Sequence, residues 1–204
     1  MMQLYHSHSS PYVRKVMVLL EESGQAASVE LIAVMGNPIN LGSLPIDQNP
    51  LGKIPALLRD DGPALYDSRV ICRYLDDRLQ TGVYPTAPRL WEVLTLEALG
   101  DGILDASVLM RYEVSLRATE HRDVAWLEGQ WAKVARALDA LEHSGMEQLT
   151  GSINMGQIAV ACALGYLDFR HAARGWAAGR PKLAAWWGAM ADRPSMKATA
   201  PPAA

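Results

Sequence analysis

The chain has 204 residues, of which 50% are hydrophobic and 20% are charged, and its formal net charge is −3 at pH 7. Its lysines and arginines are dispersed among acidic residues, which argues against a nucleic-acid-binding surface, and no apolar stretch is long enough for a membrane span. A chain of this length can hold one large or two small domains. Because no basic segment followed by an apolar one opens the sequence, we expect a cytoplasmic protein.

The two cysteines, Cys72 and Cys162, lie in apolar stretches with helical periodicity. Neither belongs to a CxxC motif or has a histidine at metal-ligand spacing, so we expect buried, reduced thiols. His6 and His8 also lack a matching pair of ligands, and we expect them to be exposed loop residues. The sequence therefore predicts no metal site.

The first eighty residues alternate between strand and helix patterns. We expect a strand at Leu4-Tyr5, a helix that Gly24 ends, and a second strand at 29–34 whose apolar run predicts burial on both faces. A loop rich in Gly, Pro and Asn follows at 36–48. Beyond it the pattern predicts a hairpin of 54–58 with 64–66, then a helix from Asp67-Ser68 with Val70, Ile71, Tyr74 and Leu75 facing inward. This order is typical of a thioredoxin-like domain.

Residues 81–88 interrupt all periodicity, and we place a domain boundary there. The predicted division is a domain at 1–80, a linker at 81–88 and an all-helical domain at 89–204. Apolar stripes predict helices at 90–117, 127–141 and 183–190. Asn154 and Gln157 have the spacing of a capping box, with Ile153 and Ile158 as its hydrophobic staple.

Three short segments of the first domain suit one small ligand. Ser9-Ser10-Pro11 opens a helix, residues 49–55 read Asn-Pro-Leu-Gly-Lys-Ile-Pro, and Asp67-Ser68 opens another helix. Proline supplies no backbone donor at a strand start, and the Ile54-Pro55 bond can be cis there. A cis bond would turn the N–H and C=O of Ile54 towards an extended ligand. The three segments together predict a pocket for a small thiol peptide.

On these segments the chain resembles the glutathione S-transferase superfamily, from Leu4 to about Pro194, and is most similar to small bacterial members with a serine-type, theta- or zeta-like first-helix motif. The resemblance implies an α/β thioredoxin-like N-terminal domain followed by an all-α C-terminal domain. It implies glutathione as cosubstrate, with its thiolate stabilised for attack on a small hydrophobic electrophile, as in detoxification. It also implies a homodimer.

Two serines compete for the contact with the thiolate. Aligned with the Cys-Pro-Tyr-Cys motif of glutaredoxins, Ser10 takes the place of the reactive cysteine, whereas aligned with theta-type transferases, Ser9 is the match. A hydroxyl at a helix N-terminus can donate a hydrogen bond to the sulfur. We favour Ser10 and keep Ser9 as the alternative, since as a plain N-cap Ser10 needs no catalytic function.

The remaining glutathione contacts follow from the charges of the ligand. Backbone N–H groups and the Ser68 hydroxyl can hold the γ-glutamyl carboxylate, while Asp67 can attract the ammonium group. Ile54, next to Pro55, is expected to pair with the cysteinyl backbone, and Lys53 to reach the glycyl carboxylate. The competing interpretations are that Asp67-Ser68 only caps the helix and that Lys53 is only a solvated loop residue.

The electrophile pocket is expected on the helical domain and the first loop. In the family it is walled by the first loop and the first long helix of the helical domain, which here suggests Tyr12, Ser107, Met110 and Arg111, with Leu99, Ile103 and Tyr112 nearby. Asp101 and Asp105 are interpreted as polar groups of the helix face or an interface. Two other functions stay open: a catalytically weak binding or regulatory protein, and a glutathione-dependent isomerase or dehalogenase.

Overall fold

The computed structural model describes residues 1–202, and the chain divides into two compact units. The first unit holds Met1–Tyr84 and the segment that begins at Pro194, and the second holds Pro85–Arg193. The division falls between Tyr84 and Pro85, within the stretch where periodicity stops.

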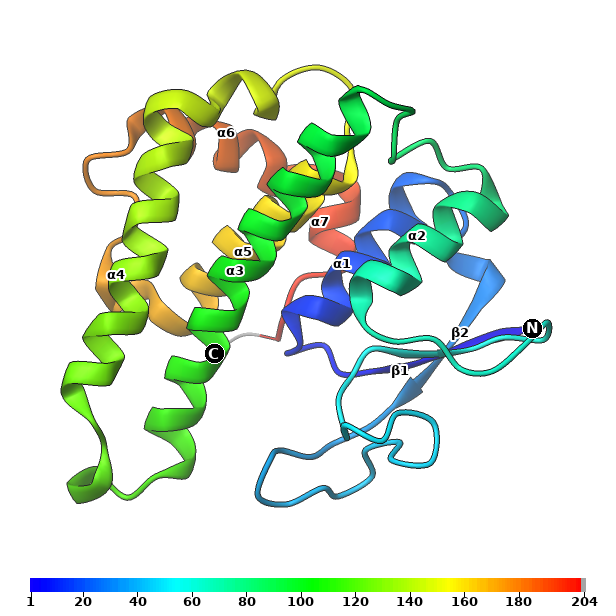
Figure 1. The fold of residues 1–204 in the computed structure, drawn as a ribbon, viewed down its shortest axis with the longest axis horizontal. Helices are drawn as coiled ribbons and strands as arrows, with labels where there is room; N and C mark the ends of the chain where they lie inside the picture. Colours follow the sequence, from blue (N-terminus) through cyan, green and yellow to red (C-terminus); the bar gives the residue numbers. More distant parts are fainter. Residues whose placement is uncertain (203–204) are drawn as a thin grey trace. The chain divides into compact units, whose positions relative to one another are not determined.

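The first unit is built on a small mixed sheet (Figure 1). Its strands are β1 (Met2–His6), β2 (Val29–Ala33) and β3 (Ala56–Leu58), in the order β2-β1-β3. β1 is central, parallel to β2 and antiparallel to β3. The helices of this unit are α1 (Pro11–Glu22), the short η1 (Ala26–Ser28), α2 (Ser68–Leu79) and α7 (Pro194–Ala198).

The start of α1 follows from its sequence. Ser10 is the N-cap in an extended conformation, and Pro11 occupies the first turn, where its missing N–H costs nothing. Val13, Val16 and Leu20 form the buried stripe that predicted this helix. The helix ends at Glu22. Ser23 is its C-cap, and Gly24 follows with φ of +67°.

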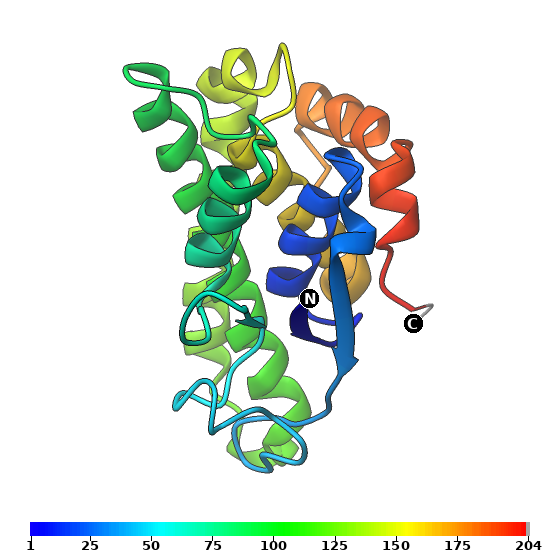
Figure 2. The same cartoon turned by 90° about the vertical axis from the view of Figure 1, so that its right-hand side faces the viewer.

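Two details of the first unit differ from the prediction. β2 is an edge strand, seen from its side in Figure 2, and Leu31 in its middle is 41% exposed, so the prediction of burial on both faces was wrong. An apolar run gives no information on whether a strand has one neighbour or two. Val70 is also exposed, because α2 buries Ile71, Cys72 and Leu75 instead.

The predicted hairpin is present in a reduced form. Leu57 of β3 and Leu65 form an antiparallel bridge, and each N–H donates to the other's carbonyl oxygen over 2.9 Å. No regular strand covers 64–66. The loop at 36–48 contains turns and no helix, in agreement with the prediction.

The last part of the chain belongs to the first unit, although the sequence-based division placed it with the helical domain. Arg14 of α1 is only 8% exposed, and its Nη2 donates to the carbonyl oxygen of Met196 over 2.9 Å. The Ser195 hydroxyl donates to the Glu22 carboxylate, and Met196 is buried. These contacts hold α7 on α1, which local periodicity could not reveal.

All regular secondary structure in the described part of the second unit is helical. Its long helices are α3 (Arg89–Leu116), α4 (Val124–Ala140), α5 (Met155–His171) and α6 (Pro181–Ala191). Short turns connect them: η2 (Thr119–His121), η3 (Leu141–Gly145), η4 (Met146–Leu149) and η5 (Ala172–Arg174). α5 is buried continuously from Met155 to Leu167 and forms the core, with α3 packed along it (Figure 1).

The N-terminus of α5 is capped as predicted by Asn154, whose Oδ1 accepts from the N–H of Gln157 over 3.1 Å. The return arm of the capping box is not made. The Gln157 side chain instead donates to the carbonyl oxygens of Thr150 at 2.9 Å and Gln148 at 3.3 Å. An amide at this position therefore ties the preceding turn to the helix, which a carboxylate could not do.

Candidate functional site

The loop between β1 and α1 contains both candidate catalytic serines, and each hydroxyl has a different partner. Ser10 Oγ accepts from the N–H of Val13 over 3.4 Å, so Ser10 does act as an N-cap. Ser9 Oγ lies 3.0 Å from Ser7 Oγ, where either hydroxyl can be the donor. The backbone N–H of Ser10 donates to the carbonyl oxygen of Ser7 and closes the turn.

These contacts leave different donors available. Ser10 donates its hydroxyl hydrogen to none of the residues that the structure describes, while the oxygen of the same group caps the helix. Capping and donation to a ligand are therefore compatible at Ser10. Ser9 keeps its hydrogen for a ligand only where the Ser7 hydroxyl is the donor of the bond between them, whereas the Ser10 hydrogen is available in either case.

The loop from Asn49 to Pro55 is fastened internally by Asn49. This side chain is 2% exposed, and its Nδ2 donates to the carbonyl oxygen of Lys53 over 2.8 Å while its Oδ1 accepts from the N–H of Leu51 over 3.1 Å. Gly52 has φ of +59°, a conformation that favours glycine. The Ile54-Pro55 bond is cis, the isomer on which the predicted exposure of the Ile54 backbone depends.

The side chains at the end of this loop differ in exposure. Lys53 is exposed and, among residues 1–202, forms no ion pair. Ile54 is half-buried and Pro55 is buried at the start of β3. A charged amine next to a short apolar strand start is thus accessible to a small anionic ligand.

Asp67 and Ser68 form the start of α2, directly after a cis Tyr66-Asp67 bond. Asp67 is the N-cap: its Oδ1 accepts from the N–H of Arg69 over 3.0 Å, and its Oδ2 lies 2.8 Å from Arg69 Nη2. Burial raises the pKa of the Asp67 carboxyl, but the hydrogen bond and charge of Arg69 outweigh burial, so the pKa lies below its ordinary value. The carboxylate is therefore charged and already engaged by Arg69.

Ser68 occupies the first turn of α2 and is 2% exposed. Its hydroxyl forms no hydrogen bond with any other described residue. Ser68 Oγ is not one of the fully buried polar atoms that lack a partner in the described part of the chain, so the hydroxyl keeps access to solvent. At a helix N-terminus, such a group is suited to an anion.

His6 is buried in a strand, so the prediction of an exposed loop residue was wrong. It is the last residue of β1 and is 5% exposed, and its Nδ1 has no hydrogen-bond partner in the described part of the chain. Burial, and then the neighbouring His8, lower the pKa of His6, so the ring is neutral at pH 7. The period-two pattern of Met2, Leu4 and His6 on one face of β1 was the available signal. His8 is exposed, as expected.

The residues suggested for the electrophile pocket belong to both units. Tyr12 lies on α1 and is half-buried, whereas Ser107, Met110 and Arg111 lie on α3. Ser107 is fully buried and donates to the carbonyl oxygen of Ile103 over 2.6 Å, and Met110 is also buried. Arg111 is half-buried. The role of these four residues remains a prediction.

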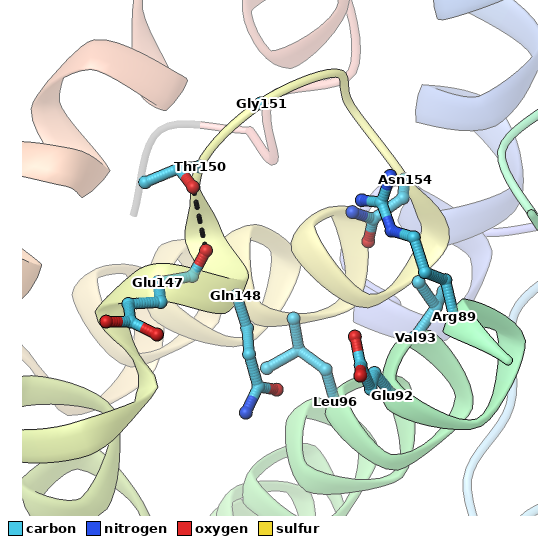
Figure 3. A pocket seen from close by; sticks show the side chains of 9 residues that line it. All are labelled: Arg89, Glu92, Val93, Leu96, Glu147, Gln148, Thr150, Gly151 and Asn154. Carbon is cyan, nitrogen blue, oxygen red and sulfur yellow. Dashed lines mark hydrogen bonds between the residues drawn. The ribbon is translucent and has the colours of Figure 1, made fainter.

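An open pocket of about 490 Å³ lies in the second unit, beside the N-terminus of α5. Figure 3 shows Glu147, Gln148 and Thr150 on one side and Arg89 and Asn154 on the other. Of the residues that line it, Val93, Leu96 and Asn154 are buried. None of the predicted site residues lines it. Its buried polar member, Asn154, is already occupied in capping α5.

Within residues 1–202, no three His, Cys, Asp or Glu side chains come together as a possible metal site. Of the helices in the same part of the chain, none has the length and apolar character needed to cross a lipid bilayer.

Comparison with known proteins identifies the family. Residues 9–78 match the glutathione S-transferase N-terminal domain and residues 124–187 match the glutathione S-transferase C-terminal domain. The chain is 35% identical to the uncharacterized GST-like protein YibF of Escherichia coli (strain K12), over 100% of both chains.

Two solved structures of a glutathione transferase family member from Pseudomonas fluorescens Pf-5 are also similar. One, with bound glutathione, is 50% identical with a TM-score of 0.96, over 99% of this chain and 100% of that one. The other, with bound S-(propanoic acid)-glutathione, is 49% identical with a TM-score of 0.91 over the same shares. The sheet-based first unit, the helical second unit and these matches together show that the chain belongs to the glutathione S-transferase family.

Proposed function

We propose that this protein is a glutathione transferase that binds glutathione on its first unit and stabilises the thiolate for attack on a small electrophile. Support comes from the relative of 50% identity that holds glutathione. It also comes from the three segments at Ser10, Lys53 to Pro55 and Asp67-Ser68, all of which lie in the first unit.

The proposed chemistry requires a thiol with a lowered pKa. An ordinary thiol has a pKa of about 8.5, so only a few per cent is ionised at neutral pH. The N-terminus of α1 supplies a positive dipole end, and the Ser10 hydroxyl supplies a hydrogen that no described residue accepts. The thiol proton leaves to solvent, and a sulfur lone pair then forms the bond to the electrophile, which either releases its leaving group with the electrons of the broken bond or, where the attack is an addition, takes up a proton from solvent.

The two ends of the ligand would contact different segments. The γ-glutamyl carboxylate would accept from the Ser68 hydroxyl and from N–H groups at the start of α2. The ammonium group would share the Asp67 carboxylate with Arg69, which already contacts it. Lys53 would approach the glycyl carboxylate, and the Ile54 backbone the cysteinyl residue.

The observation that carries this proposal is the Ser68 hydroxyl, which is nearly buried and has no protein partner at a helix N-terminus. Ser68→Ala is expected to weaken glutathione binding roughly ten- to a hundredfold, the usual worth of a hydrogen bond to a charged group. Isothermal calorimetry at constant ionic strength measures this change. Ser152→Ala, at an exposed turn of the second unit, is the control and is expected to bind like the wild type. Equal affinity of all three proteins would remove Ser68 from the site.

Three finer properties are part of the same proposal. A homodimer rests on the family resemblance. A cytoplasmic location rests on the two cysteines, Cys72 and Cys162, which are buried as a reducing compartment would allow. A role in detoxification follows if the second substrate is a reactive electrophile.

A further inference from the structure

The pocket beside the N-terminus of α5 lies wholly within the second unit, apart from the segments proposed to hold glutathione. Its volume of about 490 Å³ is in the range of small-molecule sites. Three charged side chains line it: Arg89 and Glu92 from the first turn of α3, and Glu147 from η4. None of the three forms an ion pair with any residue among 1–202. The pocket therefore combines one guanidinium and two carboxylates whose charges the protein does not neutralise.

Asn154 adds a donor that the helix cap does not use. Capping engages only its Oδ1, which accepts from the N–H of Gln157, and this bond fixes which end of the amide is the nitrogen. Asn154 is 7% exposed, and its Nδ2 donates to no residue in the described part of the chain. Nδ2 is not one of the fully buried polar atoms that lack a partner, so it opens to the pocket that Asn154 lines. Figure 3 shows Asn154 on the same side of the pocket as Arg89, so both can donate to one anionic group.

The walls of the pocket are fixed by contacts within the second unit. Three side-chain hydrogen bonds hold the segment 148–150: two come from Gln157 Nε2, and one, over 2.8 Å, from Trp186 Nε1 to a backbone carbonyl oxygen. α3 and α5 are in close contact at Gly156, where an added Cβ would lie 2.8 Å from Leu96 Cβ. Because both walls are already ordered, a ligand would not have to order them on binding.

The charges of the lining residues select the class of ligand. A simple anion would be repelled by Glu92 and Glu147, and a simple cation would be repelled by Arg89 and by the positive end of the α5 dipole. A zwitterion satisfies both kinds of group. Arg89 and Glu92 are three residues apart and are therefore neighbours on one face of α3, near enough for a single α-amino acid to bridge them.

We propose that this pocket binds a free α-amino acid with an apolar side chain, at a second site separate from that of glutathione. The carboxylate of the ligand accepts from Arg89 and from Asn154 Nδ2, and its ammonium group donates to Glu92. The side chain of the ligand contacts Val93 and Leu96, the buried apolar residues that line the pocket. The inference is independent of the proposed function, because none of these residues belongs to the segments assigned to glutathione.

L-Leucine is the probe, and two analogues each lack one of its charges. Leucinamide keeps the ammonium group without the carboxylate, and 4-methylpentanoate keeps the carboxylate without the ammonium group. Calorimetry on the full chain is expected to show that each analogue binds roughly tenfold more weakly than leucine. Two-dimensional NMR is expected to show the leucine-induced shifts at the Asn154 side-chain amide. Absence of leucine binding up to about 10 mM, or equal binding of leucine and either analogue, would overturn the proposal.

Asn154→Asp separates ligand binding from helix capping. Aspartate caps a helix as well as asparagine does, so the variant is expected to fold. The Nδ2 donor is replaced by a carboxylate oxygen, which repels the carboxylate of leucine. Leucine affinity is expected to fall roughly tenfold while leucinamide affinity does not fall, so that the preference for leucine is lost. A folded variant that keeps the wild-type preference would show that Asn154 does not contact the carboxylate and would overturn the proposed site.

Further variants separate the pocket from net charge. Arg89→Met and Glu92→Gln are each expected to weaken leucine binding roughly tenfold. Arg136→Met on α4 and Glu120→Gln in η2 remove the same charges from exposed positions and are expected to bind leucine like the wild type. Equal losses in pocket and control variants would attribute the effect to net charge and overturn the proposal.

Ser68→Ala distinguishes this pocket from the proposed glutathione site, whose γ-glutamyl end is also an α-amino acid. The variant is expected to bind leucine like the wild type. A loss of leucine binding in Ser68→Ala would place leucine on the first unit and overturn the second site, without affecting the proposed function. Circular dichroism checks the fold of each variant, and the comparison of leucine with its analogues on the wild type does not depend on any variant.

Discussion

At the residue scale, the Ser10 hydroxyl has two possible roles that its geometry allows together. Its oxygen accepts from Val13 N–H, and its hydrogen is given to no other described residue. Ser9, in contrast, already exchanges a hydrogen bond with Ser7. This difference favours Ser10 as the donor to a thiolate, and it makes the two serines separable by mutation.

Ser10→Ala is expected to raise the pKa of the bound glutathione thiol towards 8.5, because a donor to the anion is lost. Turnover at neutral pH would fall while glutathione affinity stays nearly unchanged, since the remaining contacts lie at other groups of the ligand. Ultraviolet titration of the thiolate in the complex measures the pKa. Ser9→Ala is the matched control, expected to titrate like the wild type.

The reverse pattern, with Ser9→Ala shifted and Ser10→Ala unchanged, would assign the contact to Ser9. Ser10→Ala also removes a helix cap, which costs about 1 kcal/mol of stability. The two effects are distinguishable because the cap acts on the unfolding midpoint of the unliganded protein. A drop in stability without any change in thiol pKa would leave Ser10 as a cap alone.

Site residues could be predicted where a short segment of the sequence contains the whole pattern. Helix starts at Ser10-Pro11 and Asp67-Ser68 are local patterns, and both are observed. The engagement of Asp67 by Arg69 was not foreseen, because residues two apart do not face each other inside a helix. At the N-cap the backbone is extended, and the two side chains meet.

At the element scale, glycines determine how closely α3 and α5 pack. A Cβ on Gly100 would lie 2.8 Å from the backbone carbonyl carbon of Ala159, and one on Gly156 would lie 2.8 Å from Leu96 Cβ. Neither glycine needs a left-handed backbone. Their role is to let two helices approach, which a sequence pattern shows only as a weakness in helix propensity.

Gly100→Ala is expected to destabilise the protein although alanine is the better helix former. The gain in propensity is about 1 kcal/mol, whereas forcing a methyl group against a backbone costs roughly 1–3 kcal/mol. Gly102→Ala is a matched control in the same helix, exposed and with nothing within 4 Å of the added Cβ, and it should raise stability. Urea unfolding measures both. A Gly100→Ala protein as stable as Gly102→Ala would show that the helices can separate at little cost.

The long elements were the most predictable. α3 was expected at 90–117 and is observed at Arg89–Leu116, because a sustained apolar stripe fixes both the type and the length of a helix. The edge position of β2 and the missing return arm of the capping box depend on neighbours outside the local window. Hydrophobic periodicity along the sequence cannot predict features that depend on such tertiary contacts.

At the scale of the whole molecule, the chain returns at Pro194 to complete the unit in which it began. Thr199 and Met196 supply acceptors to the buried Arg14 guanidinium, at 3.5 Å from Nε and 2.9 Å from Nη2. A division read along the sequence assigns such a segment to the preceding domain. The contacts of Arg14 show instead that α1 is stabilised by residues more than 180 positions away.

Deletion of residues 194–204 is therefore expected to loosen the first unit. Burial of Met196 is worth about 1.5–3 kcal/mol, and the charged hydrogen bond of Arg14 about as much, so protection of α1 amides should fall by a hundredfold or more. Hydrogen exchange measured by mass spectrometry reports each unit separately. Tryptophan fluorescence does not, because all six tryptophans lie at position 91 or later.

Deletion of 201–204 alone is the control and leaves the Arg14 contacts in place. If α1 exchanged equally slowly in both truncated proteins, the first unit would be complete without its returning segment, and the boundary at 89–204 would describe the domains better.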